Sequence, residues 1–219
     1  MIFIAIDPGF GGAIAILDDI ADTLIIHDIP VITQIKNKKK YKKYDLLSIV
    51  NILAQYDIDY ISIEYVHSHK GEGSVSSFNF GRGFGSLEGI VTAIIKKEVI
   101  LISPLKWKKY YPNLETNEII ELRDRQKATN AKIRDMNKDI KILKDKALKK
   151  QNKIEINNLQ KDVSKIASQI KSKSKEEALT IAKQLRPKDI DYFKRKKDAD
   201  RAEATLICLY LKDKYNELV

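Results

Sequence analysis

Short apolar runs recur along the first half of the chain, and turn-forming residues such as glycine, proline, asparagine, aspartate and serine separate them. Runs of this kind are typical of short β-strands. They predict strands at 2–7, 13–17, 23–29, 60–64 and 99–102. The first three strands are close enough to form an antiparallel meander. An amphipathic stretch at 45–56 predicts one intervening helix, and a second helix is predicted at 76–96 despite several glycines. Strand–helix–strand units after a meander indicate an α/β fold, with a mixed five-stranded sheet flanked by helices.

Residues 113–173 have a different pattern, in which charged and amide side chains dominate and glycine and aromatic residues are absent. The apolar positions fall at heptad spacing in two series: Ile133, Met136, Ile140, Leu143 and Ala147, then Leu159, Val163, Ile166 and Ile170. The two series are out of register. This predicts two helices that meet near 149–153 as a helical hairpin or coiled-coil arm, with one long helix containing a stutter as the alternative.

The pattern changes again after the arm. A helix start is predicted at Ser174, with the helix continuing to Leu185, and the last helix is predicted at 199–212. The chain then consists of one domain, formed by residues 1–112 and 174–219, that is interrupted by the arm of residues 113–173.

Composition and charge narrow the classes of partner and location. The 219 residues carry a net charge of +10, which suits a polyanionic partner. The single cysteine, Cys208, lies in an apolar helical run and excludes an internal disulfide. Met1 leads directly into the first strand without a signal peptide, and no apolar run reaches membrane-spanning length. We therefore expect a cytoplasmic protein.

Four acidic residues mark the ends of apolar elements. Asp7 and Glu64 each end a predicted strand, and Asp200 and Glu203 stand three residues apart on one face of the last helix. A carboxylate at the end of a buried strand is costly to desolvate unless a positive group pairs with it. The four acids therefore predict a shared divalent metal site. Asp198 is an alternative ligand, although it lies about 200° around an ideal helix from Asp200. Taken singly, these acids could instead cap a turn, pair with a lysine or complement a helix dipole.

The order and spacing of several motifs resemble those of the RuvC-like Holliday-junction resolvases, especially the phage-type members. The resemblance covers residues 1–112 and 174–212 and leaves out the arm. The motifs are Ala5-Ile6-Asp7-Pro8-Gly9 with Gly12-Ala13-Ile14, Ile61-Ser62-Ile63-Glu64, Phe80-Gly81-Arg82 with Gly85 and Leu87-Glu88-Gly89, Ser103-Pro104 with Trp107-Lys108, and Asp200-Arg201-Ala202-Glu203-Ala204.

This resemblance implies an RNase H-like fold, a homodimer and a requirement for Mg²⁺ or Mn²⁺. It makes Asp7, Glu64, Asp200 and Glu203 the catalytic metal ligands. The implied activity is that of a structure-selective endonuclease, which hydrolyses phosphodiesters of branched DNA and leaves 5′-phosphate and 3′-hydroxyl ends. A phage-encoded protein in the cytoplasm of a bacterial host would fit it. The inserted arm of residues 113–173 departs from the family pattern. It would extend the dimer interface, wrap around one duplex of the branched DNA or bind a protein partner.

Several side chains are candidates for DNA contact. His67 would stack on a base, and Arg82 would bind phosphate, while lysines around Trp107 would line the DNA groove unless Trp107 is a core residue and the lysines are merely solvated. Two basic clusters, at 36–43 and 194–197, would add further phosphate contacts. The complete set of candidates is His67, Arg82, Lys106, Lys108, Lys109, Lys38, Lys39, Lys40, Arg195 and Lys196.

Two other classes of protein fit parts of the pattern. The glycines from Gly9 to Gly12 after Asp7 would also suit an actin-like ATPase, although the chain is short for that two-lobed fold and lacks a second phosphate motif. A non-catalytic junction-binding or scaffold protein would use the coiled-coil arm as its working part. The set of four acids favours the nuclease.

Overall fold

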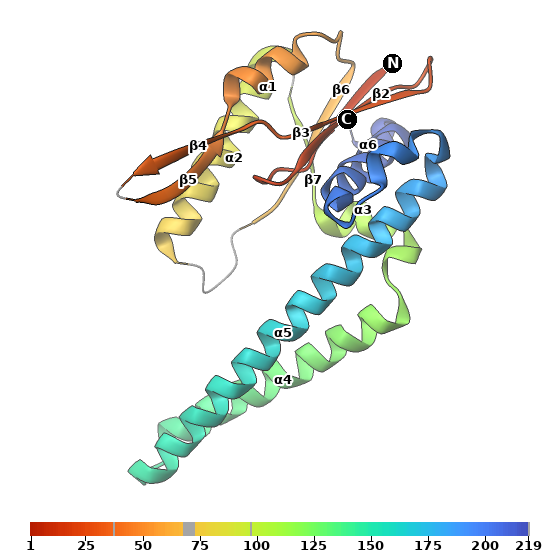
Figure 1. Ribbon diagram of the computed structural model, residues 1–219. Helices are drawn as coiled ribbons and strands as arrows, with labels where there is room; N and C mark the ends of the chain where they lie inside the picture. The colour runs from red at the N-terminus through yellow and green to blue at the C-terminus, as the bar shows by residue number, and fades with distance from the viewer. Residues whose placement is uncertain (37, 68–72, 97, 219) are drawn as a thin grey trace. The chain divides into compact units, whose positions relative to one another are not determined.

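A computed structural model describes residues 1–36, 38–67, 73–96 and 98–218 (Figure 1). The chain divides into two compact units. The first comprises Met1–Pro112 and Ala178–Val219, and the second comprises Asn113–Glu177. The second unit is thus an insertion in the first, and its boundary with the returning chain lies at Ala178 rather than at the expected residue 174.

The first unit is built on a five-stranded mixed sheet with strand order β3-β2-β1-β6-β7. Strands β1, β2 and β3 form the predicted antiparallel meander, whereas β6 and β7 run parallel to β1. The bounds are β1 (Ile2–Ile6), β2 (Ala13–Asp18), β3 (Thr23–Asp28), β6 (Tyr60–Glu64) and β7 (Ile100–Ile102). The predicted α/β class and five-stranded mixed sheet are confirmed.

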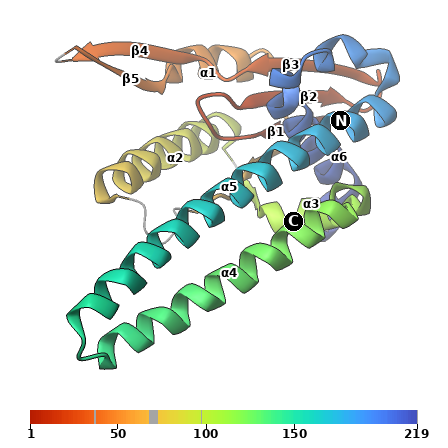
Figure 2. The same ribbon diagram turned by 60° about the horizontal axis from the view of Figure 1, so that its bottom comes forward.

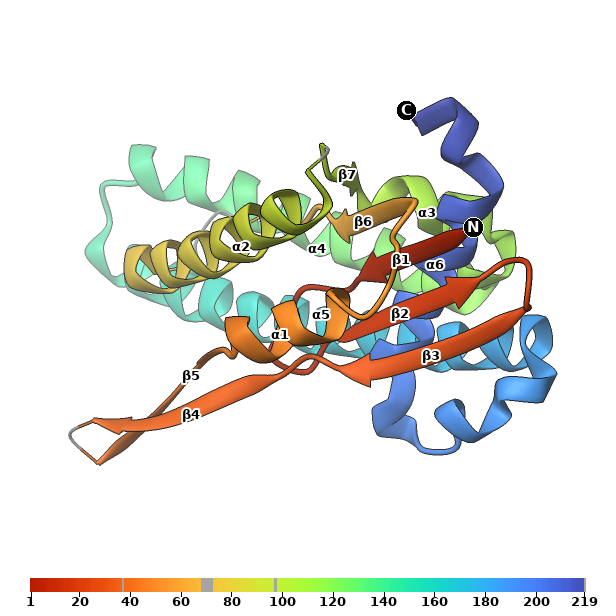
Figure 3. The ribbon, with the colours of Figure 1, turned by 90° about the horizontal axis from the view of Figure 1, so that it is seen from above.

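Helices cover both faces of this sheet (Figures 1 and 3). On one face, Ile4 and Ile6 pack with Ile49 of α1 and Leu87 of α2 in the main apolar cluster. On the other face, α6 lies against β1 and β2, where Cys208 donates from Sγ to the carbonyl oxygen of Phe3 over 3.3 Å. Alternating side chains of β1 therefore serve two buried layers, which explains its continuous apolar sequence. The helices are α1 (Leu46–Leu53), α2 (Ser74–Ile95), α3 (Pro104–Tyr110) and α6 (Ala199–Leu218), with short 3₁₀ segments at η1 (Pro112–Leu114), η2 (Pro187–Phe193) and η3 (Lys196–Asp198).

A second, two-stranded sheet was not predicted. Strands β4 (Val31–Lys36) and β5 (Lys39–Tyr44) pair antiparallel as a hairpin across the first basic tract. Lys38 lies in the turn with a φ of 60°. The run of lysines conceals the alternation of a strand, because lysines lie on both faces of the hairpin.

The second unit consists mainly of α4 (Asn117–Ile142) and the larger part of α5 (Lys146–Leu185), two antiparallel helices joined by a short turn (Figure 2). The predicted helical hairpin is therefore present. The meeting point near 149–153 was wrong, because Asp145 caps α5 by accepting from the backbone N–H of Ala147 at 2.7 Å and of Leu148 at 3.2 Å. The predicted helix start at Ser174 was also wrong, since α5 passes through it unbroken.

The heptad stripe of the arm forms its interior. Ile133 on α4 and Ile156 and Ile166 on α5 are buried, whereas Ala147 at the end of the first predicted series is exposed. An ion pair between Lys132 and Glu155, with a nitrogen–oxygen distance of 2.7 Å, links the two helices. In the part of the chain that the structure describes, no helix combines the length and the apolar character needed to cross a membrane.

Candidate metal centre

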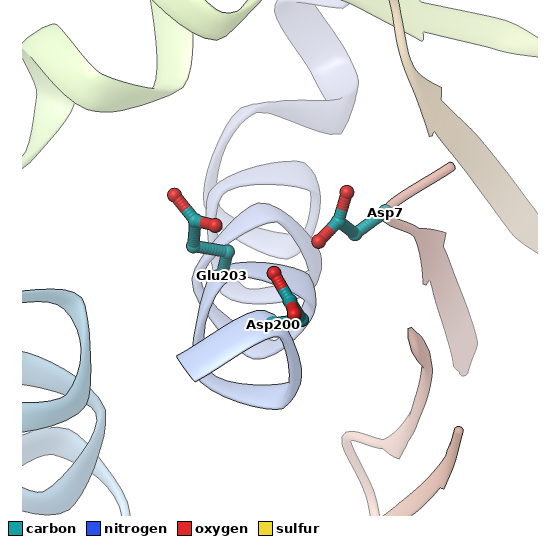
Figure 4. A group of neighbouring side chains, drawn as sticks. All are labelled: Asp7, Asp200 and Glu203. Carbon is teal, nitrogen blue, oxygen red and sulfur yellow. The ribbon is translucent and has the colours of Figure 1, made fainter. Parts of the chain in front are cut away.

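Three acidic side chains from opposite ends of the chain converge beside the sheet. Asp7 follows the last residue of β1, and Asp200 and Glu203 lie in the first two turns of α6. One carboxylate oxygen from each lies within 4.8 Å of the others (Figure 4). We call these three residues the acidic centre. Three carboxylates this close repel one another unless a cation joins them, and hard oxygen ligands are those that Mg²⁺ and Mn²⁺ prefer.

The turn after β1 sets the position of Asp7. The backbone N–H of Asp7 donates to the carbonyl oxygen of Ala13 at 2.9 Å, and that of Gly12 donates to Gly9 at 3.1 Å. A Cβ atom on Gly12 would lie 2.0 Å from the carbonyl oxygen of Asp7, which no structure tolerates. Gly12 is therefore needed for the backbone to close against Asp7 itself. This packing role explains the glycine without a bound nucleotide.

Glu64 lies next to this centre but is not one of its three converging carboxylates. Because β6 runs parallel to β1 with Ile63 opposite Ile6, Asp7 and Glu64 emerge from neighbouring strand ends. The Glu64 side chain is buried, and its Oε1 accepts a hydrogen bond from Nε1 of Trp107 at 2.8 Å. Burial raises the pKa of Glu64, while the Trp107 hydrogen bond and the charge of Lys108 oppose that rise. The nearby charge of Glu203 adds to it, so the two carboxylates interact.

Lys108 brings a positive charge to the acidic centre. Its Nζ lies 3.3 Å from Oε1 of Glu203 and 5.0 Å from the centre of the Trp107 ring. Trp107 itself is fully buried, as expected if it is a core residue. Of the three lysines predicted around it, Lys106 and Lys109 are exposed, and Lys106 lines a groove with Glu88 and Glu98 beside β7. A groove that contains those acids is a poor surface for a polyanion.

Asp198, the alternative ligand, has another partner. It is buried, and its carboxylate accepts from the backbone N–H of Arg195 at 2.8 Å and from the Arg195 guanidinium at 2.7 Å. These contacts lower the pKa of Asp198 and close the short η3 segment just before α6. Asp198 is thus placed as a cap, and Arg195, whose side chain is 53% exposed, stays a prediction for phosphate contact.

Arg201 was not singled out from the sequence, yet it anchors the start of α6. Its Nε and Nη2 donate to the two carboxylate oxygens of Asp28, at 2.6 and 2.7 Å, at the end of β3. This bidentate pair helps to hold Asp200 and Glu203 opposite Asp7. Its only sequence signal was its place between the two acids, because the partner is 173 positions away.

The remaining DNA-contact candidates lie at the surface. His67 is exposed just after β6, with its ring 4.3 Å from that of Tyr65, and Arg82 is exposed on α2. Lys196 is exposed in η3, and Lys38 and Lys40 are exposed on the β4–β5 hairpin. The side chain of Lys39 lies outside the described part of the structure. The contact of these residues with DNA stays a prediction.

Comparison of the chain with models of protein families and with curated proteins finds no match.

Proposed function

We propose that this protein is a metal-dependent, structure-selective DNA endonuclease with an RNase H-like fold, of the RuvC-like junction-resolvase type. The observation that carries the proposal is the convergence of Asp7, Asp200 and Glu203, whose carboxylate oxygens lie within 4.8 Å of one another. A strand-end acid meeting two acids on the last helix is the arrangement that the resemblance implies.

Each residue of the site has a task in phosphodiester hydrolysis. Asp7, Asp200 and Glu203 would hold the cation, and Glu64 would join them from the neighbouring strand end. A bound Mg²⁺ or Mn²⁺ supplies Lewis acidity toward the phosphate and activates water for attack. Trp107 holds the Glu64 carboxylate in a fixed orientation through its 2.8 Å hydrogen bond.

Lys108 supports the same chemistry from the protein side. Its ammonium, 3.3 Å from Glu203, offsets part of the negative charge of the centre. In this proposal the same ammonium would also bind a non-bridging oxygen of a substrate phosphate. The net charge of +10 adds general attraction to a polyanion. A homodimer would present two such centres about a two-fold axis, which suits paired cuts in a four-way junction.

The first experiment is to incubate the protein with a synthetic four-way DNA junction and Mg²⁺, beside Asp7→Asn. Cleavage needs the carboxylate, so Asp7→Asn should lower the rate at least about 1,000-fold while junction binding persists. Asp19→Asn is the matched control. Asp19 follows β2, and its backbone N–H donates to the carbonyl oxygen of Met1, at the end of β1 away from Asp7. This variant should therefore cleave like the parent. Tight binding without cleavage of four-way, three-way or flap DNA would favour the scaffold reading instead.

A second variant distinguishes Asp198, at the end of η3, from Asp200, in the first turn of α6, as the metal ligand. Asp198→Asn removes the charged partner of Arg195 but leaves the acidic centre intact. We expect it to retain cleavage within about tenfold, with a loss of about 1–2 kcal/mol in the free energy of unfolding. A cleavage rate as low as that of Asp7→Asn, in a protein that melts normally, would make Asp198 a ligand.

A further inference from the structure

Among the described residues of the first unit, the β4–β5 hairpin has no structural partner along most of its length. Only its base is held, where Val31 and Tyr44 pack against the main apolar cluster and Asp45 N–H donates to Pro30 at 2.9 Å. The hairpin extends away from the five-stranded sheet (Figure 3). A two-stranded hairpin is marginally stable by itself in water, so an extended one with both faces open is unusual without a partner.

The base of the hairpin is joined to the acidic centre. The Tyr44 ring lies 5.2 Å from that of Phe10, which belongs to the same turn as Asp7. Burial, with a smaller contribution from the charge of Asp7, raises the pKa of Tyr44 to about 12. Gly83 lets α2 approach on the other side, because a Cβ atom there would lie 3.2 Å from the Tyr44 ring. The hairpin is therefore fixed at its base beside the centre.

Positive charge covers both faces of the hairpin. Cross-strand pairs share a face, so Lys40 and Lys42 lie on one face with Ile35 and Thr33, and Lys43 lies on the other with Ile32. Residues 31–44 contain lysines but no acidic residue. Within the described part of the chain, Lys38, Lys40, Lys42 and Lys43 are exposed and none forms an ion pair with an acid.

Three large apolar side chains are exposed among these lysines, and the least exposed of them is Ile32, at 37%. Ile35 is 72% exposed on one face, and Tyr41 is 50% exposed on the other. Exposed apolar side chains do not help to keep a charged hairpin solvated. An isoleucine can contact a thymine methyl group, and a tyrosine can stack on or hydrogen-bond to a base or sugar. The apolar exposure is thus a second observation, independent of the charge, that points to a ligand.

We propose that the β4–β5 hairpin enters the major groove of a duplex arm of the DNA substrate and sets the distance from that arm to the acidic centre. The major groove admits a two-stranded ribbon of this kind, whereas the deep, narrow groove of double-stranded RNA does not. The inference rests on the proposed nuclease function for its substrate, but the binding that it describes can be measured without cleavage.

The length of the hairpin fixes its reach. Each strand has six residues, which corresponds to about 20 Å of extended chain. Successive phosphates along one DNA strand are about 3.4 Å apart along the helix axis. The hairpin therefore spans about six nucleotides of one arm, measured from the cleavage position.

The first test measures the salt dependence of junction binding in an Asp7→Asn background, which prevents cleavage. The hairpin variant combines Lys38→Ala, Lys40→Ala, Lys42→Ala and Lys43→Ala. Each lost phosphate contact should reduce the slope of log Kd against log salt by about 0.9, so a total reduction of about 3–4 is expected. The matched control is the combination Lys144→Ala, Lys146→Ala, Lys149→Ala and Lys150→Ala in the arm, which removes the same charge.

The second test locates the hairpin on DNA. Native Cys208 is fully buried, so Tyr41→Cys supplies a single reactive thiol for an iron–EDTA cleavage reagent. Radical cleavage should fall within about six nucleotides of the crossover on a duplex arm. The same reagent on Ile20→Cys, a position 86% exposed in the β2–β3 turn, should leave that window uncut.

The outcomes separate this inference from the proposed function. An unchanged salt slope in the hairpin variant, or an equal reduction in the arm control, overturns the hairpin inference even if the parent cleaves junctions. Hairpin-dependent binding that is stronger to double-stranded RNA or to anionic lipid vesicles than to DNA also overturns it. Normal hairpin-dependent DNA binding by a parent protein that cleaves no branched DNA overturns the nuclease proposal alone.

Discussion

The acidic centre and the β4–β5 hairpin are two charged regions of the same unit, and they are held in opposite ways. At the centre, Asp7 follows a buried strand, and α6 is anchored by the pairing of Arg201 with Asp28. Beside the centre, Glu64 is held by a hydrogen bond from Trp107. On the hairpin, the described lysines are exposed and the apolar side chains Ile35 and Tyr41 face solvent.

This difference separates two uses of charge. Like charges are brought together at the centre at a cost that packing and hydrogen bonds must offset, so changes there should alter folding and chemistry together. The hairpin carries its charge in water at little cost, so changes there should alter binding alone. Substitutions in the two regions should therefore give effects of different kinds as well as different sizes.

The largest effect on folding is expected from the glycine that closes the turn beside Asp7. Gly12→Ala would place a Cβ atom 2.0 Å from the Asp7 carbonyl oxygen, against backbone that cannot yield. We expect a loss of about 3 kcal/mol in the free energy of unfolding, measured by denaturant titration, together with loss of cleavage.

The neighbouring glycine gives the control. Gly11→Ala would bring its Cβ atom only to 3.5 Å from an Asp200 carboxylate oxygen, which is an ordinary contact. That variant should lose less than about 1 kcal/mol. Equal losses from the two substitutions would show that Gly12 does not set the position of Asp7.

An intermediate effect is expected from the hydrogen bond that holds Glu64. Trp107→Phe removes the Nε1 donor and leaves a buried carboxylate short of a partner, at a cost of about 1–3 kcal/mol. It should also raise the pKa of Glu64 further, because the Trp107 hydrogen bond now opposes the effect of burial. The acidic limb of the cleavage rate against pH should therefore move to higher pH.

The sign of the stability change follows from the same shift. A raised pKa means that Glu64 holds its proton more tightly in the folded than in the unfolded chain, so the contribution of Glu64 to metal-free stability is largest at low pH and is lost as pH rises through the folded pKa. In Trp107→Phe this fall should occur at higher pH. Tyr111→Phe, which removes a buried 2.9 Å hydrogen bond to the Leu206 carbonyl, should destabilise without moving the pH profile. A profile unmoved by both substitutions would contradict the role of Trp107.

The sheet and the centre were largely predictable because their signals are local. Asp7 and Glu64 each end an apolar run, which predicts that they lie at strand ends. The spacing of Asp200 and Glu203 predicts that they share one helix face. The commitment of Asp198 to Arg195 was not foreseen, since its carboxylate resembles those of its neighbours until its hydrogen bonds are known. The hydrogen bond of Trp107 to Glu64 and the pairing of Arg201 with Asp28 join distant segments and have no periodic signal.

The missed features of the arm and the hairpin have a different cause. Heptad spacing predicted the buried stripe of the arm, but the turn was placed wrongly because Asp145, a cap, looks like any other acid in a charged sequence. In the hairpin, lysines occupy both faces, so the alternation of polar and apolar positions that marks a half-buried strand is absent. The periodicity of apolar residues reflects which side chains are buried, so a strand with few buried side chains has little periodicity by which to recognise it.

The smallest effect on folding is expected from the hairpin lysines, and it completes the contrast with Gly12 and Trp107. The four substitutions Lys38→Ala, Lys40→Ala, Lys42→Ala and Lys43→Ala remove exposed charges that form no ion pair within the described residues. The free energy of unfolding, measured by the same denaturant titration, should change by less than about 0.5 kcal/mol for each single substitution. At low salt each substitution should raise the free energy of unfolding, because repulsion between the neighbouring lysines is relieved. A loss of more than about 2 kcal/mol in the combined variant would mean that these lysines stabilise the fold, and the separation of a structural centre from a binding hairpin would then fail.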